Sequence, residues 1–489
     1  MSKKIDDFFK NIVSHAKEYG FVFPSSEIYD GLSAVYDYGQ LGAELKNNLK
    51  TYWWKSMVQL NENIVGIDAA IFMHPNTWKA SGHVDGFSDP MIDNKDSKKR
   101  YRADQLIEEK IDRYEKDGKS DKAAELQEAL DAALNADDLA QLKALIEEHN
   151  IVCPVSGTKN WTDVRQFNLM FATQMGAMAD GAEQVYLRPE TAQGIFVNFL
   201  NVQKTGRMKI PFGIAQIGKA FRNEVIARQF IIRMREFEQM EMQFFVRPGT
   251  EMEWYQKWKE TRLKWHLALG ADSEKYRYHD HAKLAHYANA AVDIEYDFPF
   301  GFKEVEGIHS RTDFDLSQHQ KFSGKKMQYF DPEVNQNYVP YVIETSIGLD
   351  RLFLTIFANS LVNEDLSTEA KQDSRVVLKF HPAIAPVKAA VLPLTKKDGL
   401  PDKAREILAT LKMDFNTQYD EKDAIGKRYR RQDAIGTPYC ITVDYQTLED
   451  DTVTIRHRDS MEQERVAIAD LQRLIQDNVS WTSLLKQLV

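Results

Sequence analysis

The sequence predicts an α+β protein of several domains, and three observations support this. The 489 residues are enough for about three domains at the usual ~150 residues each. Strand-like runs at residues 216–224 and 229–246 lie on either side of a short loop at 225–229, which predicts an antiparallel hairpin. Beyond about residue 374, strand-like and helical runs alternate, which predicts a separate α/β domain at 375–489.

Four regions follow one another along the chain. Residues 1–102 are rich in aromatic side chains, and Leu45, Leu49 and Trp53 recur at four-residue steps after Gly42, which predicts an amphipathic helix. Residues 103–150 are rich in Glu, Lys, Ala and Leu, which predicts a charged helical insertion, expected to be a solvated helical hairpin, with a break near Gly118. Residues 151–365 alternate strands with helices. A linker at about 363–374 then leads to the last domain.

Two further elements are expected in the third region. Residues 254–270 are rich in helix-forming side chains and predict a helix. The run YVIETSIGLDRLFLTIFANSL predicts a strand, a glycine-containing turn and then an apolar helix.

Composition sets limits on the class of protein. No stretch reaches the ~20 apolar residues of a membrane helix, and MSKKIDDFFK does not look like a secretion signal. Two cysteines exclude a disulfide scaffold, so we expect a protein of the reducing cytoplasm with no membrane partner.

The net charge of −10 is concentrated in one part of the chain. Residues 103–150 contain 14 acidic and 6 basic side chains, whereas residues 203–235 contain eight Lys or Arg and one acid. An overall acidic charge therefore does not exclude a local site for an anion, because electrostatic fields act over a Debye length of about 10 Å.

The hairpin carries charges that an ordinary half-buried strand would not carry. Arg233, Arg235, Phe237 and Glu241 are expected to share one face with Gln239, because strand side chains alternate, and Arg222 and Glu224 are expected to form a second pair. Two guanidinium groups suit phosphate, and an aromatic ring suits a base. A salt-bridged exposed sheet is the alternative. The sequence has no G-x4-G-K-[ST] loop, no strand-linked G-x-G-x-x-G and no H-E-x-x-H, so a nucleotide would bind to a sheet bearing arginines.

Two other segments suggest binding chemistry. RPETAQGIFVNF places Glu190 before an apolar helix, where a carboxylate is often only a partner of the helix dipole. ETSIGLDR places Glu344 and Ser346 before a helix that carries Arg351, which needs an anionic partner; a structural salt bridge is the alternative. His309 and His381 are expected to be structural.

Taken together, these motifs resemble a known enzyme family. FRNE, REFEQME and the unit that ends in Arg351 resemble motifs 2 and 3 of class II aminoacyl-tRNA synthetases. With FVFPSSEIYDGL, SGHVDGFSDPM, RPETAQGIFVNF and KIPFGIAQIGKAFRNE, the chain resembles the single-chain, homodimeric glycyl-tRNA synthetases over nearly its whole length. The resemblance implies an antiparallel β-sheet core flanked by helices, a variable insertion at 103–150, and a C-terminal α/β anticodon-binding domain.

The resemblance also implies substrates and site residues. ATP and glycine would give glycyl-adenylate and pyrophosphate, and glycine would then pass to the terminal ribose of tRNA(Gly). Arg222 would bind the α-phosphate, Glu224 the adenine side, Arg233 and Arg351 the γ-phosphate end, and Phe237 would stack on adenine; Arg222, Glu224 and Arg351 are the expected catalytic set. The remaining ATP residues would be Asn223, Ile232, Glu304, Val305 and Gly348, with Mg²⁺ at Glu304.

For glycine, the implied residues are Arg102, Glu190, Phe237, Glu241, Glu344, Ser346 and Gly348. Three carboxylates suit a small ammonium ligand and would crowd out larger amino acids. Overpacking a rigid site costs about 1–3 kcal/mol, so we expect no editing domain.

Two features distinguish this chain within the resemblance. Where some relatives have four cysteines of a zinc knuckle, this chain has Asn94, Ser97, Cys153 and Ser156, so we expect no structural zinc. In the last domain, the basic residues Lys427, Arg428, Arg430 and Arg431 surround Tyr429, and the resemblance implies that this cluster contacts tRNA. Two rival hypotheses stay open here: a non-catalytic nucleic-acid-binding accessory protein of the same fold, and a class II synthetase for another amino acid.

Overall fold

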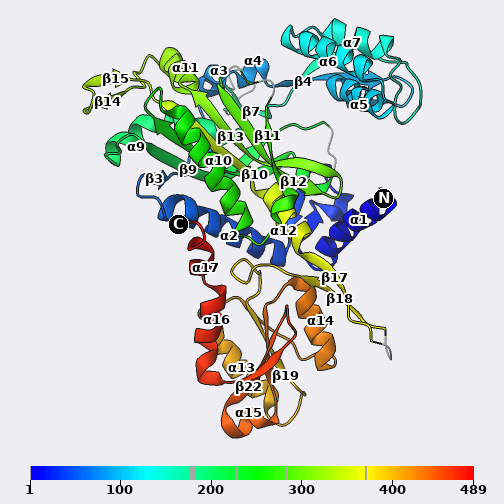
Figure 1. Ribbon diagram of the computed structural model, residues 1–489, viewed down its shortest axis with the longest axis vertical. Coiled ribbons are helices and arrows are strands. Elements are labelled where there is room, and N and C mark those ends of the chain that lie inside the picture. Colours follow the sequence, from blue (N-terminus) through cyan, green and yellow to red (C-terminus); the bar gives the residue numbers. More distant parts are fainter. Residues whose placement is uncertain (1, 177–182, 226–228, 282–283, 286, 369–371) are drawn as a thin grey trace.

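A computed structural model describes the chain except residues 1, 177–182, 226–228, 282–283, 286 and 369–371 (Figure 1). Its centre is a seven-stranded sheet of order β11-β12-β13-β16-β10-β9-β3, in which every neighbouring pair is antiparallel except β3 and β9. The strands are Tyr276–Asp280 (β11), Ala290–Phe298 (β12), Gly301–Thr312 (β13), Tyr341–Gly348 (β16), Glu236–Val246 (β10), Phe212–Phe221 (β9) and Ile64–Gly66 (β3). The predicted α+β class is confirmed.

Helices cover the two faces of this sheet unequally. On one face, α2 (Gln40–Trp54), α10 (Glu251–Leu267) and α12 (Leu349–Ser360) enclose the main apolar core with the inward-facing residues of β10, such as Met240 and Phe244. On the other face, α8 (Ala192–Val197) and α9 (Phe199–Thr205) cover one end, where Phe245 is buried. Next to α8 and α9, the same face of the sheet carries polar side chains, and this polar part faces the candidate site.

The predicted helices of the core are confirmed. The four-residue spacing of Leu45, Leu49 and Trp53 lies on α2, and all three side chains are buried. The helix expected at 254–270 is α10, and the strand and helix expected after Tyr341 are β16 and α12. Other helices around this core are α1 (Ser2–Glu18), α3 (Pro75–Ala80), α4 (His83–Gly86) and α11 (Phe314–Ser323).

The predicted hairpin forms, but its strands are shorter than expected. β9 ends at Phe221 and β10 begins only at Glu236, and a 3₁₀ turn occupies Phe230–Ile232. The backbone φ angles of Gln229 and Phe230 are 65° and 58°, which a strand cannot accommodate. The prediction that Arg233 and Arg235 share the strand face of Phe237, and that Arg222 and Glu224 lie on the neighbouring strand, is therefore wrong: the four charges lie beyond the strand ends. Of the expected loop at 225–229, residues 226–228 lie outside the described residues.

The acidic insertion forms three helices rather than a hairpin. They are α5 (Ala103–Lys116), α6 (Ser120–Asn135) and α7 (Leu139–Glu148), and the predicted break at Gly118 is confirmed by a φ of 72° there. Their core also contains Ile92 and Trp161 from flanking segments, next to the sheet β5-β4-β6 of Lys99–Arg102, Ser88–Asn94 and Arg165–Asn168. The packing unit is thus wider than residues 103–150.

The expected linker at 363–374 begins and ends in paired strands. β17 (Leu361–Asp365) pairs antiparallel with β18 (Ser374–Leu378), and Arg375 Nε lies 2.5 Å from Glu364 Oε2. The linker is therefore an ordered two-stranded connection, at least in the residues that are described.

The last domain is α/β, as predicted. Its sheet has the order β20-β19-β21-β22-β23, from Thr417–Tyr419, Ala389–Pro393, Tyr439–Val443, Thr452–His457 and Gln463–Ala467. Its helices are α13 (Leu400–Leu411), α14 (Ile425–Ile435), α15 (Tyr445–Asp450), α16 (Leu471–Val479) and α17 (Trp481–Leu485).

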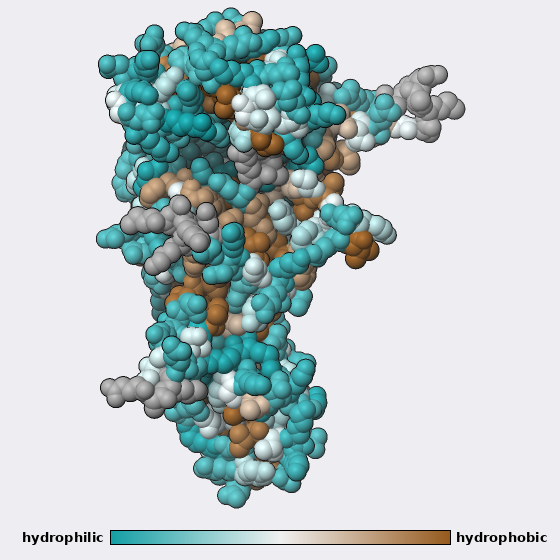
Figure 2. Space-filling view, turned by 90° about the vertical axis from the view of Figure 1, so that its right-hand side faces the viewer, coloured by the Kyte–Doolittle hydropathy of each residue, from teal (hydrophilic) through white to brown (hydrophobic). Residues whose placement is uncertain are grey.

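Smaller features complete the surface. Three short antiparallel strand pairs among the described residues are β1 (Val22–Pro24) with β2 (Tyr36–Tyr38), β7 (Ala172–Met175) with β8 (Glu183–Tyr186), and β14 (Tyr329–Asp331) with β15 (Gln336–Tyr338). Among the described residues, no helix combines the length and apolarity needed to cross a membrane. Figure 2 shows a largely hydrophilic face on which apolar side chains gather between the upper body and the C-terminal domain.

Candidate active site

A pocket opens on the polar part of the seven-stranded sheet. Residues from β10, β13, β16, α12 and the loop after β9 line it, and they include Arg222, Glu224, Ile232, Arg233, Phe237, Glu304, Ser346, Gly348 and Arg351. The structure therefore brings together most of the predicted nucleotide residues, although their positions span 130 residues of sequence.

Arg222 lies between two aromatic rings. Its guanidinium carbon is 5.2 Å from the ring centre of Phe237 and 5.4 Å from that of Phe87, and its Nε donates to the carbonyl of Pro189 at 3.1 Å. These contacts fix the direction of the guanidinium, which reduces the entropy lost when it binds an anion.

Arg351 lies in the first turn of α12 and also lines the pocket. Its NH1 lies 2.8 Å from Glu304 Oε2, and its Nε donates to the carbonyl of Ile232 at 3.1 Å. The guanidinium of Arg351 lowers the pKa of Glu304 against the effect of burial. Arg233 NH1 lies 3.5 Å from Glu224 Oε2. The pocket wall thus combines three arginines with three carboxylates, and the pairs Arg233–Glu224 and Arg351–Glu304 partly neutralise one another.

Two of the predicted ATP residues, Val305 and Asn223, are held by contacts within the protein. The side chain of Val305 is buried in the main core, so a ligand could reach only its backbone. The backbone N–H of Asn223 donates to the carbonyl of Leu169 at 2.8 Å, which holds the loop after β9 against the strand of the insertion.

A buried niche beside this pocket contains three carboxylates. Glu241 and Glu344 are 2% and 4% exposed, and Gln243 Nε2 bridges them at 2.9 and 2.6 Å. Glu190 accepts from Gln193 Nε2 at 2.9 Å and lies 3.4 Å from His83 Nε2. Gln239 connects niche and pocket, since its amide oxygen accepts from the backbone of Thr191 and its amide nitrogen lies 3.4 Å from Ser346 Oγ.

The three carboxylates differ in their protonation. Burial, together with the charges of Glu344 and Glu190, raises the pKa of Glu241 well above its ordinary value. Burial would raise the pKa of Glu344 too, but Arg311 and His309 lower it far below its usual range. His83 and Arg311 likewise overcome burial at Glu190 and lower its pKa to about 2. Within the niche, the pKa of Glu241 is thus shifted in the opposite direction to those of Glu190 and Glu344.

Sequence reasoning missed the cation that organises this niche. Arg311 is buried, and its guanidinium lies between Glu344 Oε2 at 3.1 Å and Asp315 Oδ2 at 2.8 Å. His309, expected to be structural, places Nδ1 2.9 Å from Glu344 Oε1. The alternation of side chains along β13 could have indicated these two residues. It puts positions 309 and 311 on one face of the strand, and His309 pairs with Glu344 on the neighbouring strand β16.

Other predicted glycine residues take different positions. Gly348 pairs with Gln239 across β16 and β10, at the boundary of pocket and niche. Arg102 lies on β5, where its guanidinium is held by Asp89 at 3.0 Å and by Asp104 at 2.5 Å. The structure thus places Arg102 in an ion-pair group beside the site, whereas Gly348 lines it.

A second buried arginine packs against β9 and holds the backbone next to the site. Arg188 is 2% exposed and donates to the carbonyls of Lys219 and Ala69 at 2.6 and 2.8 Å. A Cβ at Gly218 would lie 2.2 Å from its NH2 atom, so β9 must carry glycine there for Arg188 to fit.

The three arginines of α14 already have partners within the domain. Arg428 is buried and donates to the carbonyls of Pro393 and Leu394 at 2.6 and 3.2 Å. Arg431 pairs with Asp420, Arg430 with Asp373, and Tyr429 shares a hydrogen bond with Thr442. Lys427 is exposed. Of the predicted cluster, Arg428 therefore has a structural role, and the exposed and half-buried cations remain candidates for RNA contact.

The four positions expected at a zinc knuckle do meet in space. Ser97 Oγ lies 3.3 Å from Cys153 Sγ, and Ser156 Oγ donates to Asn94 Oδ1 at 3.0 Å. Hydrogen bonds connect these positions, which is compatible with the expectation that no structural zinc is bound; that expectation stays a prediction.

Comparison with known proteins identifies the class first. The model of the tRNA synthetase class II core domain (G, H, P, S and T) matches residues 171–360, and the anticodon binding domain model matches residues 388–478. Fold and matches together define a class II aminoacyl-tRNA synthetase core joined to an anticodon-binding domain. Glycyl-tRNA synthetase insertion domain 1 matches residues 89–125 and 118–169, the same wider unit that packs around α5, α6 and α7.

Full-length relatives then identify the family. The glycine–tRNA ligase of Chlorobaculum tepidum is 56% identical over 457 residues, covering 93% of this chain and 96% of that protein. Those of Staphylococcus haemolyticus and Staphylococcus aureus strain JH9 are each 52% identical and cover 96% and 98% of this chain, and 99% and 100% of their own. The chain belongs to the glycine–tRNA ligase family, as the motifs predicted.

Proposed function

We propose that this protein activates glycine with ATP and transfers it to tRNA(Gly). The single observation that carries the proposal is that an arginine-lined pocket is continuous with a buried three-carboxylate niche through Gln239 and Ser346. A polyanion and a small ammonium compound would therefore meet at one point on the sheet. Family membership supports the same reaction.

In the first step, a carboxylate oxygen of glycine attacks the α-phosphorus of ATP, and the bond to the β-phosphate oxygen breaks to release pyrophosphate. Arg222 binds the α-phosphate, where negative charge develops, while Arg233 and Arg351 hold the far phosphates of a bent ATP. Phe237 stacks on adenine and Glu224 accepts from its amino group. These residues act by positioning and electrostatic stabilisation, without a protein nucleophile.

Mg²⁺ would accompany the nucleotide. Mg²⁺ prefers one or two carboxylates together with phosphate oxygens, and Glu304 lines the pocket with its carboxylate beside Arg351. The donor set fits, and the ion would neutralise charge on the departing pyrophosphate.

The niche selects glycine by exclusion. The ionised carboxylates Glu190 and Glu344 attract the ammonium group, and the packed side chains around them leave little volume beside the α-carbon. A methylene changes binding by only about 1–3 kcal/mol in a permissive pocket, so selection against alanine needs a steric clash.

The second step and the assembly involve other surfaces. A ribose hydroxyl at the 3′ end of tRNA(Gly) attacks the carbonyl of glycyl-adenylate and AMP leaves; exposed cations of α14, such as Lys427, contact the tRNA.

Ile28, Tyr29 and Leu32 are 88%, 80% and 57% exposed, an apolar surface suited to pairing of two copies in a cytoplasmic homodimer.

ATP–pyrophosphate exchange measured with each of the twenty amino acids tests the proposal. We expect exchange with glycine and at most weak exchange with alanine. Exchange with a different amino acid would support a class II synthetase of another specificity, and no exchange with any amino acid would support a non-catalytic binding protein; either result would reject the proposal.

A further inference from the structure

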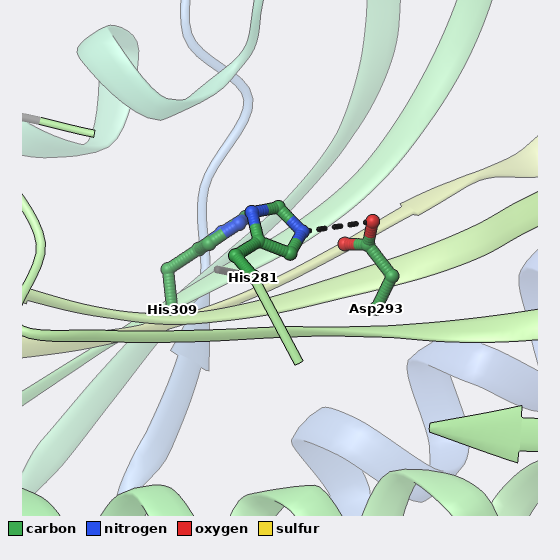
Figure 3. A group of neighbouring side chains, drawn as sticks. All are labelled: His281, Asp293 and His309. Carbon is green, nitrogen blue, oxygen red and sulfur yellow. Dashed lines mark ion pairs between the residues drawn. The ribbon is translucent and has the colours of Figure 1, made fainter. Parts of the chain in front are cut away.

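Three side chains from neighbouring segments of the sheet converge beside the niche (Figure 3). His281 follows β11, Asp293 lies on β12, and His309 lies on β13. One possible ligand atom of each residue lies within 4.8 Å of the other two, and His281 Nε2 is 2.9 Å from Asp293 Oδ2. The three groups are close enough to share one ion after small side-chain rotations.

The orientation of His309 is an independent observation that points to a metal. Its Nδ1 lies 2.9 Å from Glu344 Oε1, a buried carboxylate oxygen that can accept a hydrogen bond. When Nδ1 donates to this carboxylate, the lone pair of Nε2 is the one that can bind a ligand. Metal-binding histidines are usually held in this way, with the second ring nitrogen donating to a carboxylate.

The backbone leaves room for this arrangement at Gly307. A Cβ at this position would lie 2.8 Å from His309 Cε1 and 3.5 Å from both His309 Nε2 and Asp293 Oδ1. Nε2 of His309 and the carboxylate of Asp293 therefore approach the same bare stretch of β13. The side chains are 31%, 17% and 19% exposed for His281, Asp293 and His309, so the site is shielded but open to a small ion.

We propose that His281, Asp293 and His309 bind a divalent transition metal of the zinc class. Two imidazoles and one carboxylate favour zinc or a similar ion, since Mg²⁺ and Ca²⁺ prefer oxygen ligands throughout. In a tetrahedral site with bonds of about 2.0–2.2 Å, ligand atoms stand roughly 3.3 Å apart, so the three atoms need only modest adjustment. Three protein ligands leave one position for water.

The metal would also hold His309 against Glu344. This consequence for glycine binding rests on the proposed function, whereas metal binding does not, because it is measured without substrate. The two can fail separately: a protein without glycine activity could still bind the metal, and an active enzyme could lack it.

Titration of the full-length, chelator-treated protein with Co²⁺ tests the inference, since Co²⁺ reports its ligands through visible absorption. We expect one Co²⁺ per chain in the wild type, displaced by Zn²⁺. His281→Ala and Asp293→Asn should bind more than about 100-fold more weakly, beyond the roughly 10–100-fold typical of changes to outer-sphere partners. His279→Ala is the matched control: His279 lies two positions earlier on β11 and pairs with Glu295 at 3.2 Å, outside the cluster, so this variant should keep the site.

Several results would overturn the inference. They are no stoichiometric Co²⁺ in the wild type, unchanged affinity in His281→Ala, or a site that disappears in Cys153→Ser and shows thiolate absorption. Circular dichroism establishes whether each variant folds. Should His281→Ala fail to fold, the Cu²⁺-loaded wild type gives a second measurement, because hyperfine couplings to two imidazole nitrogens are expected by electron paramagnetic resonance, and one or none would contradict the assignment.

Discussion

Replacing Glu344 with Gln should destabilise the catalytic domain far more than the same replacement at Glu241. Both carboxyl groups are buried on neighbouring strands and both accept from Gln243. Arg311 and His309 lower the pKa of Glu344 against burial, whereas burial and the neighbouring carboxylates raise the pKa of Glu241. Gln has the shape and charge of a protonated Glu, so only the change at position 344 leaves buried cations without their partner.

The magnitude follows from these contacts. Removing one partner of a buried ion pair costs about 3–5 kcal/mol, whereas a neutral isosteric change with retained hydrogen bonds should cost about 1 kcal/mol or less. A domain of this size loses roughly 2–4 °C of melting temperature per kcal/mol. Glu344→Gln should therefore melt about 6–20 °C lower than the wild type, and Glu241→Gln less than about 4 °C lower.

Differential scanning calorimetry at several pH values measures both effects. The folded pKa of Glu344 is depressed, so its stabilisation is present above its unfolded pKa and is lost as pH falls through the folded pKa. The difference between wild type and Glu344→Gln should therefore begin to narrow as the pH falls below the ordinary value of 4.5. Equal losses for the two variants at neutral pH, or a larger loss for Glu241→Gln, would refute the opposite directions of the two pKa shifts.

Three further predictions follow from the site. Arg222→Ala should slow ATP–pyrophosphate exchange by about 10²–10³-fold, or 3–4 kcal/mol, and near-wild-type exchange would reject its place at the α-phosphate. Glycine binding should release a proton and tighten as pH rises, because the ammonium group of glycine lowers the raised pKa of Glu241. Equal calorimetric heats of glycine binding in two buffers of different ionisation enthalpy would contradict this proton release. Lys427→Ala should weaken tRNA charging and reduce the salt slope of charging by about one, while ATP–pyrophosphate exchange is retained. Arg428→Ala should instead destabilise the C-terminal domain. A reduced salt slope with unchanged stability in Arg428→Ala would show that Arg428 contacts tRNA and would contradict its structural role.

Local patterns were sufficient for most elements of the fold. The four-residue spacing of Leu45, Leu49 and Trp53 predicted α2, and the alternating strands and helices after β18 predicted the last domain. The pattern failed where two residues with positive φ, Gln229 and Phe230, interrupt an apolar and charged run that otherwise reads as a strand. Backbone handedness at single positions is not visible in residue periodicity.

The sequence by itself determined the elements, the family and the residue types of the site, because helix and strand periodicity and short motifs depend on neighbours along the chain. Only the tertiary structure decided which partner each charge has. Arg428 is enclosed by carbonyls, Arg102 pairs with Asp89 and Asp104, and His309 reaches Glu344 from 35 positions away. Such pairings depend on strand register and on packing between distant segments, and they set protonation states through burial and charge, which no local pattern contains.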